Sequence, residues 1–434
     1  MKTNPWVALL LGLTPTLVLV PGCAVDGSNE ADTEVTQEDL STAPDARTIA
    51  PSDLGKRFVT CPVTNTQEAA SATFRGKRYA YRSDAEMDPT SPGWEARATF
   101  DDHALDGLVP TDASAMLIDI RRVNGKPAYA YYGANGNRHT TYEPWSSAKF
   151  MAASAAMSRV RSSSSLGVGA RSTVGDSAVG DLVTAMEAYR SSGNVSASSN
   201  ALAGYFLTVA GAEYTNGLLH GSWLNLAGDG SQFHVSTNPE RTRSAWGEDP
   251  FSPGSRVWRD ASGKTLTTSP DTKMVDDKPL SALAQAEWLK RLTQHELVPT
   301  SSLPNLQRAD LDVLFYGAPG ATKAGGMLAG VSNYVANAIA GTTAADDAAT
   351  TKAKLEQKVG SAWRIFHKVG WGDSTSRSRS EVVLASYACL PGYDGGHEFV
   401  LVLRTSVPLS SVNRAGEVAQ ARARAIVGAV LEAR

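Results

Sequence analysis

Strand-like segments lie near both ends of this 434-residue chain, whereas helix-like segments fill its middle. Two apolar runs, 115–120 and 128–132, flank the pair Asn124-Gly125, and Asn-Gly is the dipeptide that a tight β-hairpin favours. Two further strands are predicted near the C-terminus, at 382–387 and 399–403. Strands from both ends must meet in one sheet, so we expect an α/β (α+β) fold. It has an antiparallel sheet built from both chain ends with flanking helices, plus an inserted all-helical lobe.

The predicted helices rest on apolar residues that recur with a helical period. The last one, 416–434, places Ala419, Ala423 and Ile426 on one face together with Val427 and Val430. The other predicted helices are at about 147–160, 180–190, 199–210, 280–295 and 326–340. Residues 227–278 are rich in Gly, Ser, Asp, Pro and Trp and predict a long surface excursion. We therefore expect one domain at 56–434, with an α/β lobe at about 56–145 and 355–434 and a helical lobe at about 146–354.

The first 22 residues are typical of an export signal. Lys2 precedes an apolar run that ends at Pro21-Gly22-Cys23, and the run is too short for a spanning helix and contains Pro15. The segment resembles a bacterial lipoprotein signal, which implies lipidation of Cys23; an ordinary secretion signal cut nearby is the alternative. The protein is thus predicted to be exported to the cell envelope, with a periplasmic or extracellular body anchored to the membrane only by lipid at Cys23.

Residues 23–55 are predicted to form a disordered acidic tether. This segment has many Asp and Glu residues, a single arginine and no aromatic residue. Such a segment buries too little apolar surface to offset the entropy of ordering it. With Cys23 taken by the signal, two cysteines remain, Cys61 and Cys389. In an oxidising compartment they either pair in a disulfide or stay as buried thiols.

The overall composition excludes several classes of protein. Lys and Arg total 41 against 44 Asp and Glu, so bulk positive charge for binding nucleic acid is absent. Three cysteines cannot build a four-thiolate zinc site. The seven histidines show neither HxH nor HExxH spacing. We therefore predict no metal, no cofactor and no nucleic-acid partner.

Three short motifs follow one another along the chain. The first is an SxxK at Ser146 to Lys149, the second an SxN at Ser198 to Asn200, and the third a KxG at Lys368 to Gly370. Each one alone is weak evidence, because other SxN and KxG matches occur. Their contexts are more specific. The SxxK opens an Ala-rich helix that puts the serine and the lysine on one face, the SxN enters an apolar helix, and the KxG lies in a strand.

With these motifs in these contexts, the chain resembles the penicillin-recognising serine hydrolases of the class A β-lactamase type. Residues 198–207 resemble the SDNTAANLL-like helix of that family, and 363–370 resemble its WRVxxKTG-like strand. The resemblance covers roughly residues 110–434. It implies a β-lactamase/transpeptidase-like fold and an exported serine hydrolase that forms an acyl-enzyme and hydrolyses amides.

The resemblance also implies a role for each matched residue. Ser146 is the nucleophile and Lys149 the base, because a hydroxyl attacks efficiently only when a neighbouring group takes its proton. Ser198 passes a proton to the leaving nitrogen. Asn200 holds the substrate amide, and Lys368, next to Gly370, attracts the substrate carboxylate. The backbone N–H groups of Ser146 and Trp371 form the oxyanion hole.

Two departures from the family pattern leave the substrate open. Val369 replaces the usual Thr or Ser of the third motif, which removes a hydroxyl that helps to bind the substrate carboxylate. The chain has no ExxLN motif, which in the family carries the glutamate that hydrolyses the acyl-enzyme. Glu240 and Glu248 lie in the corresponding excursion, neither with the flanking pattern, and Glu240 is the weak candidate for that base.

Three functions remain possible at this point: a β-lactamase-like hydrolase, a D,D-peptidase-like cell-wall enzyme with slow β-lactam turnover, and a catalytically decayed lipoprotein that binds a peptide or wall fragment. The partner is accordingly a β-lactam or a cell-wall peptide. The simplest structural alternative is that Ser146 and Ser198 only cap helices, since serine is a favoured N-cap residue.

Overall fold

The computed structural model describes residues 40–62, 69–162, 171–237, 244–251, 258–260, 262–267, 275–318 and 323–433. All of them belong to one compact unit, Glu34–Arg434. The predicted signal and Cys23 lie outside the described residues, so export and lipidation stay predictions. Among the helices that are described, none is at once long and apolar enough to traverse a bilayer.

The central sheet draws its strands from both ends of the chain, and the predicted fold class is confirmed. Its strand order is β15-β16-β17-β5-β6-β3, and β4 pairs in parallel with β6. The neighbours along the main order are antiparallel. These strands are β3 (Arg82–Ser83), β4 (Phe100–Asp101), β5 (Ser114–Val123), β6 (Lys126–Gly133), β15 (Arg364–Ser374), β16 (Arg379–Leu390) and β17 (His397–Pro408). Strand β15 stands at one edge of the sheet.

The predicted hairpin is present between β5 and β6. Its two turn residues, Asn124 and Gly125, both have positive φ, 53° and 73°. Positive φ at both positions is the requirement of a type I′ turn, which matches the twist of the two strands it joins. The pairing of Val123 with Lys126 sets the register of the whole hairpin.

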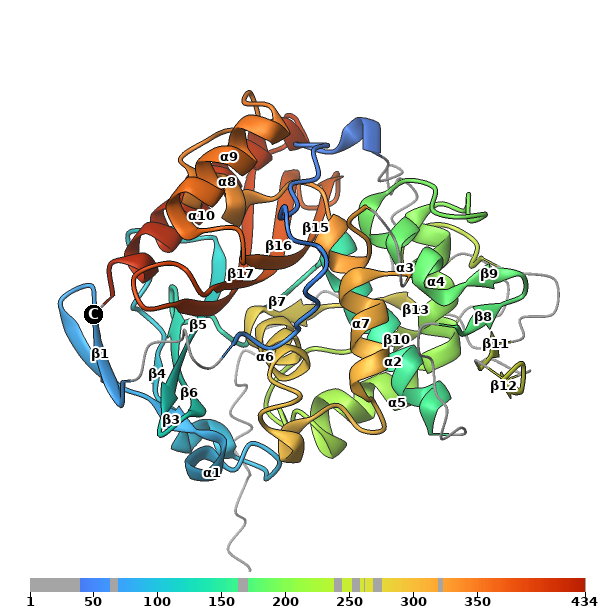
Figure 1. Ribbon diagram of the computed structural model, residues 1–434, viewed down its shortest axis with the longest axis horizontal. Helices are drawn as coiled ribbons and strands as arrows, with labels where there is room; N and C mark the ends of the chain where they lie inside the picture. The colour runs from blue at the N-terminus through green and yellow to red at the C-terminus, as the bar shows by residue number, and fades with distance from the viewer. Residues whose placement is uncertain are drawn as a thin grey trace, which may run out of the picture. The chain divides into compact units, whose positions relative to one another are not determined.

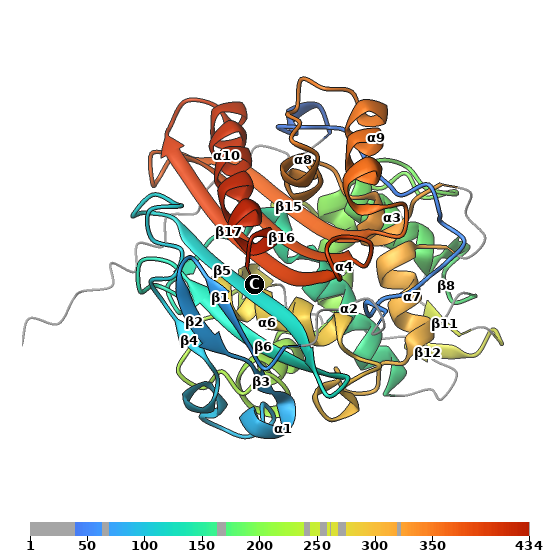
Figure 2. The ribbon, with the colours of Figure 1, turned by 60° about the vertical axis from the view of Figure 1, so that its left-hand side comes forward.

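Helices cover both faces of this sheet (Figures 1 and 2). On one face lie α8 (Tyr334–Ala340), α9 (Ala348–Val359) and α10 (Val412–Leu431), and on the other α6 (Ala282–Thr293) and α2 (Lys149–Arg161). Side chains alternate along a strand, so β5 sends Leu117 into the core under α10 and Ile118 into the core of the opposite face. The predicted apolar face of the last helix is confirmed, since Ala419, Ala423 and Ile426 are buried there.

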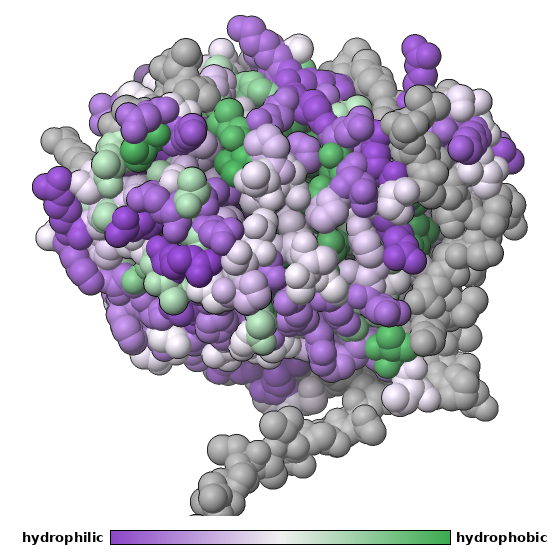
Figure 3. Space-filling view, turned by 90° about the horizontal axis from the view of Figure 1, so that it is seen from below, coloured by the Kyte–Doolittle hydropathy of each residue, from purple (hydrophilic) through white to green (hydrophobic). Residues whose placement is uncertain are grey.

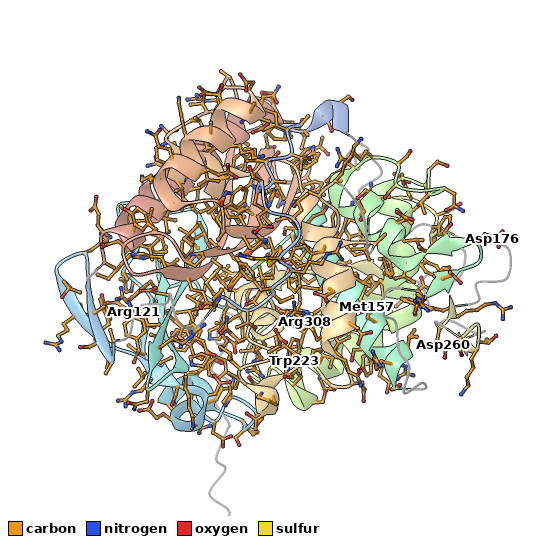
Figure 4. The ribbon with its side chains drawn as sticks, in the orientation of Figure 1. Arg121, Met157, Asp176, Trp223, Asp260 and Arg308 are labelled. Atoms are coloured by element: carbon orange, nitrogen blue, oxygen red, sulfur yellow. A yellow bond between two sulfur atoms is a disulfide. The ribbon has the colours of Figure 1, made fainter. Side chains whose placement is uncertain are left out.

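The remaining helices form a lobe beside the sheet, at the right of Figure 1. It contains α3 (Val179–Ala188), α4 (Ser199–Ala210), α5 (Ala212–Gly217) and α7 (Arg308–Tyr316) around α2. Figure 4 shows Met157 of α2 inside this lobe and Asp176 at its outer edge. The predicted lobe boundaries differ from the packing in one respect: α6 and α8, both inside 146–354, pack on the sheet side, against β5, β16 and β17 and against α10.

The predicted tether is wrong over about its second half, because residues 40–55 pack on the domain. Ile49 and Asp45 are buried, and Arg47 pairs with Asp45 at 2.6 Å. The Ser332 hydroxyl donates to the Asp45 carbonyl at 2.8 Å. The composition of the segment did not predict this packing. One apolar side chain and two oppositely charged ones are enough to order a segment that crosses an existing surface. The short 3-10 helix η1 (Leu40–Thr42) begins the described part of this segment.

The long excursion contains short strands and buried aromatic residues where it is described. Its strands are β10 (His234–Val235), β11 (Trp258–Arg259), β12 (Thr265–Thr267) and β13 (Val275–Asp277). Trp246 and Trp258 are buried, so the tryptophans serve packing. Elsewhere short pieces complete the fold: β1 (Ser71–Phe74), β2 (Lys77–Ala80), β7 (Thr141–Tyr142), β8 (Thr173–Val174), β9 (Ser177–Ala178), β14 (Leu280–Ser281) and α1 (Asp84–Met87).

Cys61 and Cys389 form a disulfide, with their Cα atoms 5.5 Å apart. The bond links the start of the domain to β16 across 328 residues of sequence, so the beginning and end of the domain are adjacent, as the predicted sheet requires. The face of the molecule in Figure 3 is mainly hydrophilic with scattered hydrophobic residues. Of the large hydrophobic side chains that are described, Val235 and Leu409 are exposed.

Candidate functional site

Ser146 lies in the 3-10 helix η4 (Trp145–Ala148), which runs directly into α2. The residue before it, Trp145, has φ of 50°, a left-handed conformation that costs energy for a bulky side chain. Its surroundings hold it there: the Trp145 indole donates to Glu381 at 3.1 Å, and the Trp145 carbonyl accepts from the Trp246 indole at 3.1 Å. The backbone at Ser146 is therefore fixed by tertiary contacts rather than by local preference.

Edge strand β15 packs directly on the backbone of Ser146. A Cβ atom at Gly370 would lie 2.3 Å from the Ser146 nitrogen and 2.6 Å from the Ser147 nitrogen. Only glycine allows the strand to approach the helix start this closely. Two of the predicted motifs, more than 200 residues apart, thus meet in space, and the Trp371 backbone follows Gly370 at the same place.

The second motif meets the first through Lys149. The Lys149 Nζ atom donates to the Asn200 side-chain oxygen at 2.5 Å and to the Ser199 hydroxyl at 2.9 Å. Both acceptors lie in the first turn of α4, and the Ser199 hydroxyl itself donates to the Met186 carbonyl at 2.6 Å. Lys149 is fully buried, so these contacts replace the water that a lysine normally binds.

Ser198 occupies a different place from the one its predicted role requires. Its hydroxyl caps α4 by accepting from the Ala201 nitrogen at 3.1 Å, and it donates to the Glu248 carboxylate. The hydroxyl that contacts Lys149 is that of Ser199, which the sequence analysis did not select. Serine at an N-cap position was a signal for the capping role. Glu240, the weak deacylation candidate, lies outside the described residues, and the glutamate placed at the second motif is Glu248.

The third motif reaches the site through Lys368. Its ammonium donates to the carbonyls of Met186 at 2.8 Å and Glu187 at 3.2 Å, at the C-terminal end of α3. The Tyr189 ring centroid is 3.8 Å from this ammonium and 5.1 Å from the Lys149 Nζ atom. The two lysines, from α2 and β15, thus share one aromatic ring, which places the first and third motifs at one site.

Glu187 is a second residue that sequence reasoning missed. Its side chain is fully buried, and Oε2 lies 3.8 Å from the Lys368 ammonium. Burial raises the pKa of Glu187 to about 7, against the lowering effect of Lys368 and then Lys149. Nothing in the local sequence distinguishes it, because an acidic residue near a helix end is ordinarily solvated.

Aromatic residues cover the site where the motifs meet. Ser146 and Lys149 are 0% exposed and Lys368 is 1% exposed. Tyr189 covers the lysines, donates its hydroxyl to the Val369 carbonyl at 3.1 Å, and packs on Trp371 with ring centroids 4.9 Å apart. The Trp371 indole in turn donates to the Thr42 hydroxyl at 3.1 Å. The packed segment 40–55 therefore contacts one of the aromatic residues that cover the site.

The strand residue before Lys368 points away from the pocket. The His367 Nε2 atom lies 3.0 Å from the Val331 carbonyl, and burial lowers the pKa of His367 to about 4. It is a neutral core histidine. Across the residues that the structure describes, no group of three or more His, Cys, Asp or Glu side chains is arranged to hold a metal ion.

Comparison with known proteins finds similarity to solved structures alone. No protein-family model matches the chain, and no curated protein matches its sequence. Solved structures that resemble it include the TLA-1 extended-spectrum β-lactamase, at 11% identity and TM-score 0.40, covering 76% of this chain and 95% of that one. A class A β-lactamase from Bacteroides cellulosilyticus is 10% identical, with TM-score 0.41 and coverage of 73% and 91%. The last common ancestor of Gram-negative bacteria β-lactamase, class A, is 16% identical, with TM-score 0.38 and coverage of 73% and 93%.

Proposed function

We propose that this protein is a serine hydrolase that forms an acyl-enzyme at Ser146. The observation that carries the proposal is the convergence of three motifs at one pocket: Gly370 packs on the Ser146 backbone, Lys149 binds Asn200, and Lys149 and Lys368 share the Tyr189 ring. Helix caps alone would not bring two buried lysines and a serine together, since buried amines are costly without a compensating role.

The proposed chemistry follows from the position of each group. Ser146 Oγ attacks the acyl carbon while its proton passes to the neutral amine of Lys149, one helical turn further on. The backbone N–H groups of Ser146 and Trp371 stabilise the developing oxyanion. Ser199 and Asn200 orient the Lys149 amine, so Ser199 takes the place in this scheme that the sequence predicted for Ser198. The acyl-enzyme is then released by water.

The test is covalent labelling of the full chain with a fluorescent fluorophosphonate, a reagent that captures activated serines. We expect one adduct, mapped by mass spectrometry to Ser146, and a loss of at least about 100-fold in labelling rate for Ser146→Ala. Ser147→Ala is the matched control, since the Ser147 hydroxyl donates to the Pro144 carbonyl within the same turn at 2.7 Å and has only long contacts, 3.3 and 3.4 Å, with the Gln285 side chain. Labelling that persists in Ser146→Ala would contradict the proposal.

The burial of the site favours one second candidate, a protein that keeps the pocket closed and binds a peptide or wall fragment without catalysis. The zero exposure of Ser146 and Lys149 is the observation behind it. The same experiment separates the two functions: an unlabelled wild-type protein that still binds wall fragments supports the binder, and a Ser146 adduct excludes it.

A further inference from the structure

The ammonium of Lys368 already has partners within the chain. It donates to two carbonyls of α3, faces the Tyr189 ring, and is 1% exposed. A carboxylate on an incoming substrate would need such a cation to balance its charge once it left water. It could bind Lys368 only by displacing these contacts.

Glu187 adds a fixed carboxylate at the same lysine. Its side chain is 0% exposed, and neither carboxylate oxygen accepts a hydrogen bond within the part of the chain that the structure describes. The charged groups that act on it come from two other elements: Lys368 of β15, 3.8 Å away, and Lys149 of α2. Tyr189 of its own helix end covers both lysines. A buried, unbonded carboxylate is costly, so its retention beside two amines calls for an explanation.

We propose that Glu187 is an internal counter-ion that excludes anionic substrates, and that the pocket takes neutral esters or amides with no carboxylate near the reacting carbonyl. The inference rests on the proposed acyl transfer at Ser146. With Glu187 ionised, a second carboxylate entering this closed pocket would be repelled by it and would also lose its own hydration. A neutral acyl group is not repelled by Glu187 and has no charge whose hydration must be lost.

Val369, the residue after Lys368 on β15, supports the same selectivity. It offers no side-chain hydroxyl, and its carbonyl already accepts from Tyr189 at 3.1 Å. β-Lactams and peptides ending in a free carboxylate are both anionic, so both would be poor substrates. The raised pKa of Glu187, about 7, adds a pH dependence: as Glu187 takes up a proton below that pH, the repulsion disappears.

The reaction tested is transfer of an acyl group from an aryl ester. The Ser146 Oγ–acyl bond forms, the ester C–O bond breaks, and para-nitrophenolate leaves with the bonding pair. The serine proton passes to Lys149, and water later cleaves the acyl-enzyme to the free acid. Para-nitrophenyl butyrate and para-nitrophenyl hemisuccinate make a matched pair, with equal acyl chains that differ by one terminal carboxylate.

For the wild-type protein at about pH 8, we expect kcat/KM for the neutral ester to exceed that for the anionic ester by roughly tenfold or more, because Glu187 already balances the charge of Lys368 and leaves no cation for a second carboxylate. Glu187→Gln should bring this ratio to within about threefold of one. Lowering the pH from about 8 to about 6 should shrink the wild-type ratio and leave that of Glu187→Gln constant. Each rate is corrected for spontaneous hydrolysis and for the Ser146→Ala background.

Glu213→Gln is the matched control, since it removes an exposed glutamate from α5 in the same lobe. Its ester ratio should equal that of the wild type. If the wild type shows no preference, or if Glu187→Gln and Glu213→Gln behave alike, the counter-ion proposal is wrong even though Ser146 reacts. If Ser146 reacts with neither ester nor with the fluorophosphonate, the failure belongs to the proposed function instead.

Discussion

Two buried glutamates of this protein, Glu187 in the pocket and Glu287 under the sheet, have similar surroundings by composition. Each is 0% exposed and each is acted on by two cations. Glu187 has Lys368 and Lys149, and Glu287 has Lys290 and Arg291. Yet their carboxyl groups differ in the direction of their pKa shifts, so burial and neighbouring charge type alone do not decide the state of a carboxyl.

The difference lies in the hydrogen bonds. Glu287 Oε1 is 2.8 Å from Lys290 and accepts from Arg291 at 2.7 Å, while its Oε2 accepts from the Tyr131 hydroxyl at 3.0 Å. Arg291 also donates to the carbonyl of Trp223, which Figure 4 places beside α6. Burial raises the pKa of Glu287, but these partners outweigh it and hold the pKa below its ordinary value.

Glu187 has similar charged neighbours but no short hydrogen bond from them. The Lys368 ammonium lies 3.8 Å from Glu187 Oε2, beyond hydrogen-bonding distance, and donates instead to the carbonyls of Met186 and Glu187. Desolvation therefore dominates, and the pKa rises to about 7. We infer that the Glu287 network stabilises the fold, while Glu187 is retained at a cost in stability, as functional groups in pockets often are.

The largest expected effect is a difference in stability between variants of the two glutamates. Glu287→Gln leaves Lys290 and Arg291 buried without a counter-charge and should lower the free energy of unfolding by about 3–5 kcal/mol. Glu187→Gln should not lower the free energy of unfolding at about pH 8, because it removes a buried charge that has no short hydrogen bond. Urea unfolding followed by tryptophan fluorescence measures both. Equal destabilisation by the two variants would break the comparison.

The next effect is the pH dependence that Glu187 imposes. Its pKa in the folded protein, about 7, exceeds the ordinary value of 4.5, so between these pH values the folded state binds more protons than the unfolded state. Stability should therefore fall as the pH rises from 4.5 to about 7, by on the order of 3 kcal/mol at most. The Glu187→Gln curve should lack this fall; a parallel decline in both proteins would assign it to other groups.

The smallest expected effect is the pH dependence of stability caused by His139, a partly exposed side chain. His139 contacts Asp229 at 2.9 Å and Glu95 at 3.0 Å, and these hydrogen bonds raise its pKa from 6.5 to about 9. The stability it contributes is complete below pH 6.5 and is lost as the pH rises through about 9. Because His139 is 35% exposed, solvent screening limits the change to below about 1 kcal/mol. Tm against pH for wild type and His139→Gln measures it, and an unchanged slope would remove His139 as the cause.

The sequence itself determined the elements whose signals are local. The turn pair Asn124-Gly125 set a hairpin, helix α4 begins and ends at the predicted residues 199 and 210, and the apolar face of the last helix was readable from its period. Three motifs gave the candidate pocket. Local patterns suffice in these cases because the turn residues, caps and spacing each act within a few residues of chain.

Only the tertiary structure decided which side chains contact one another at the site. Lys368 binds the carbonyl of Met186, 182 residues away, and that contact puts Glu187 beside the lysine. Which of two adjacent serines faces Lys149, and whether an acidic segment packs or stays solvated, likewise depended on surfaces supplied by distant elements. A side chain's partners, burial and proton affinity are properties of the assembled fold, because electrostatic and packing energies depend on distance in space and not on separation along the chain.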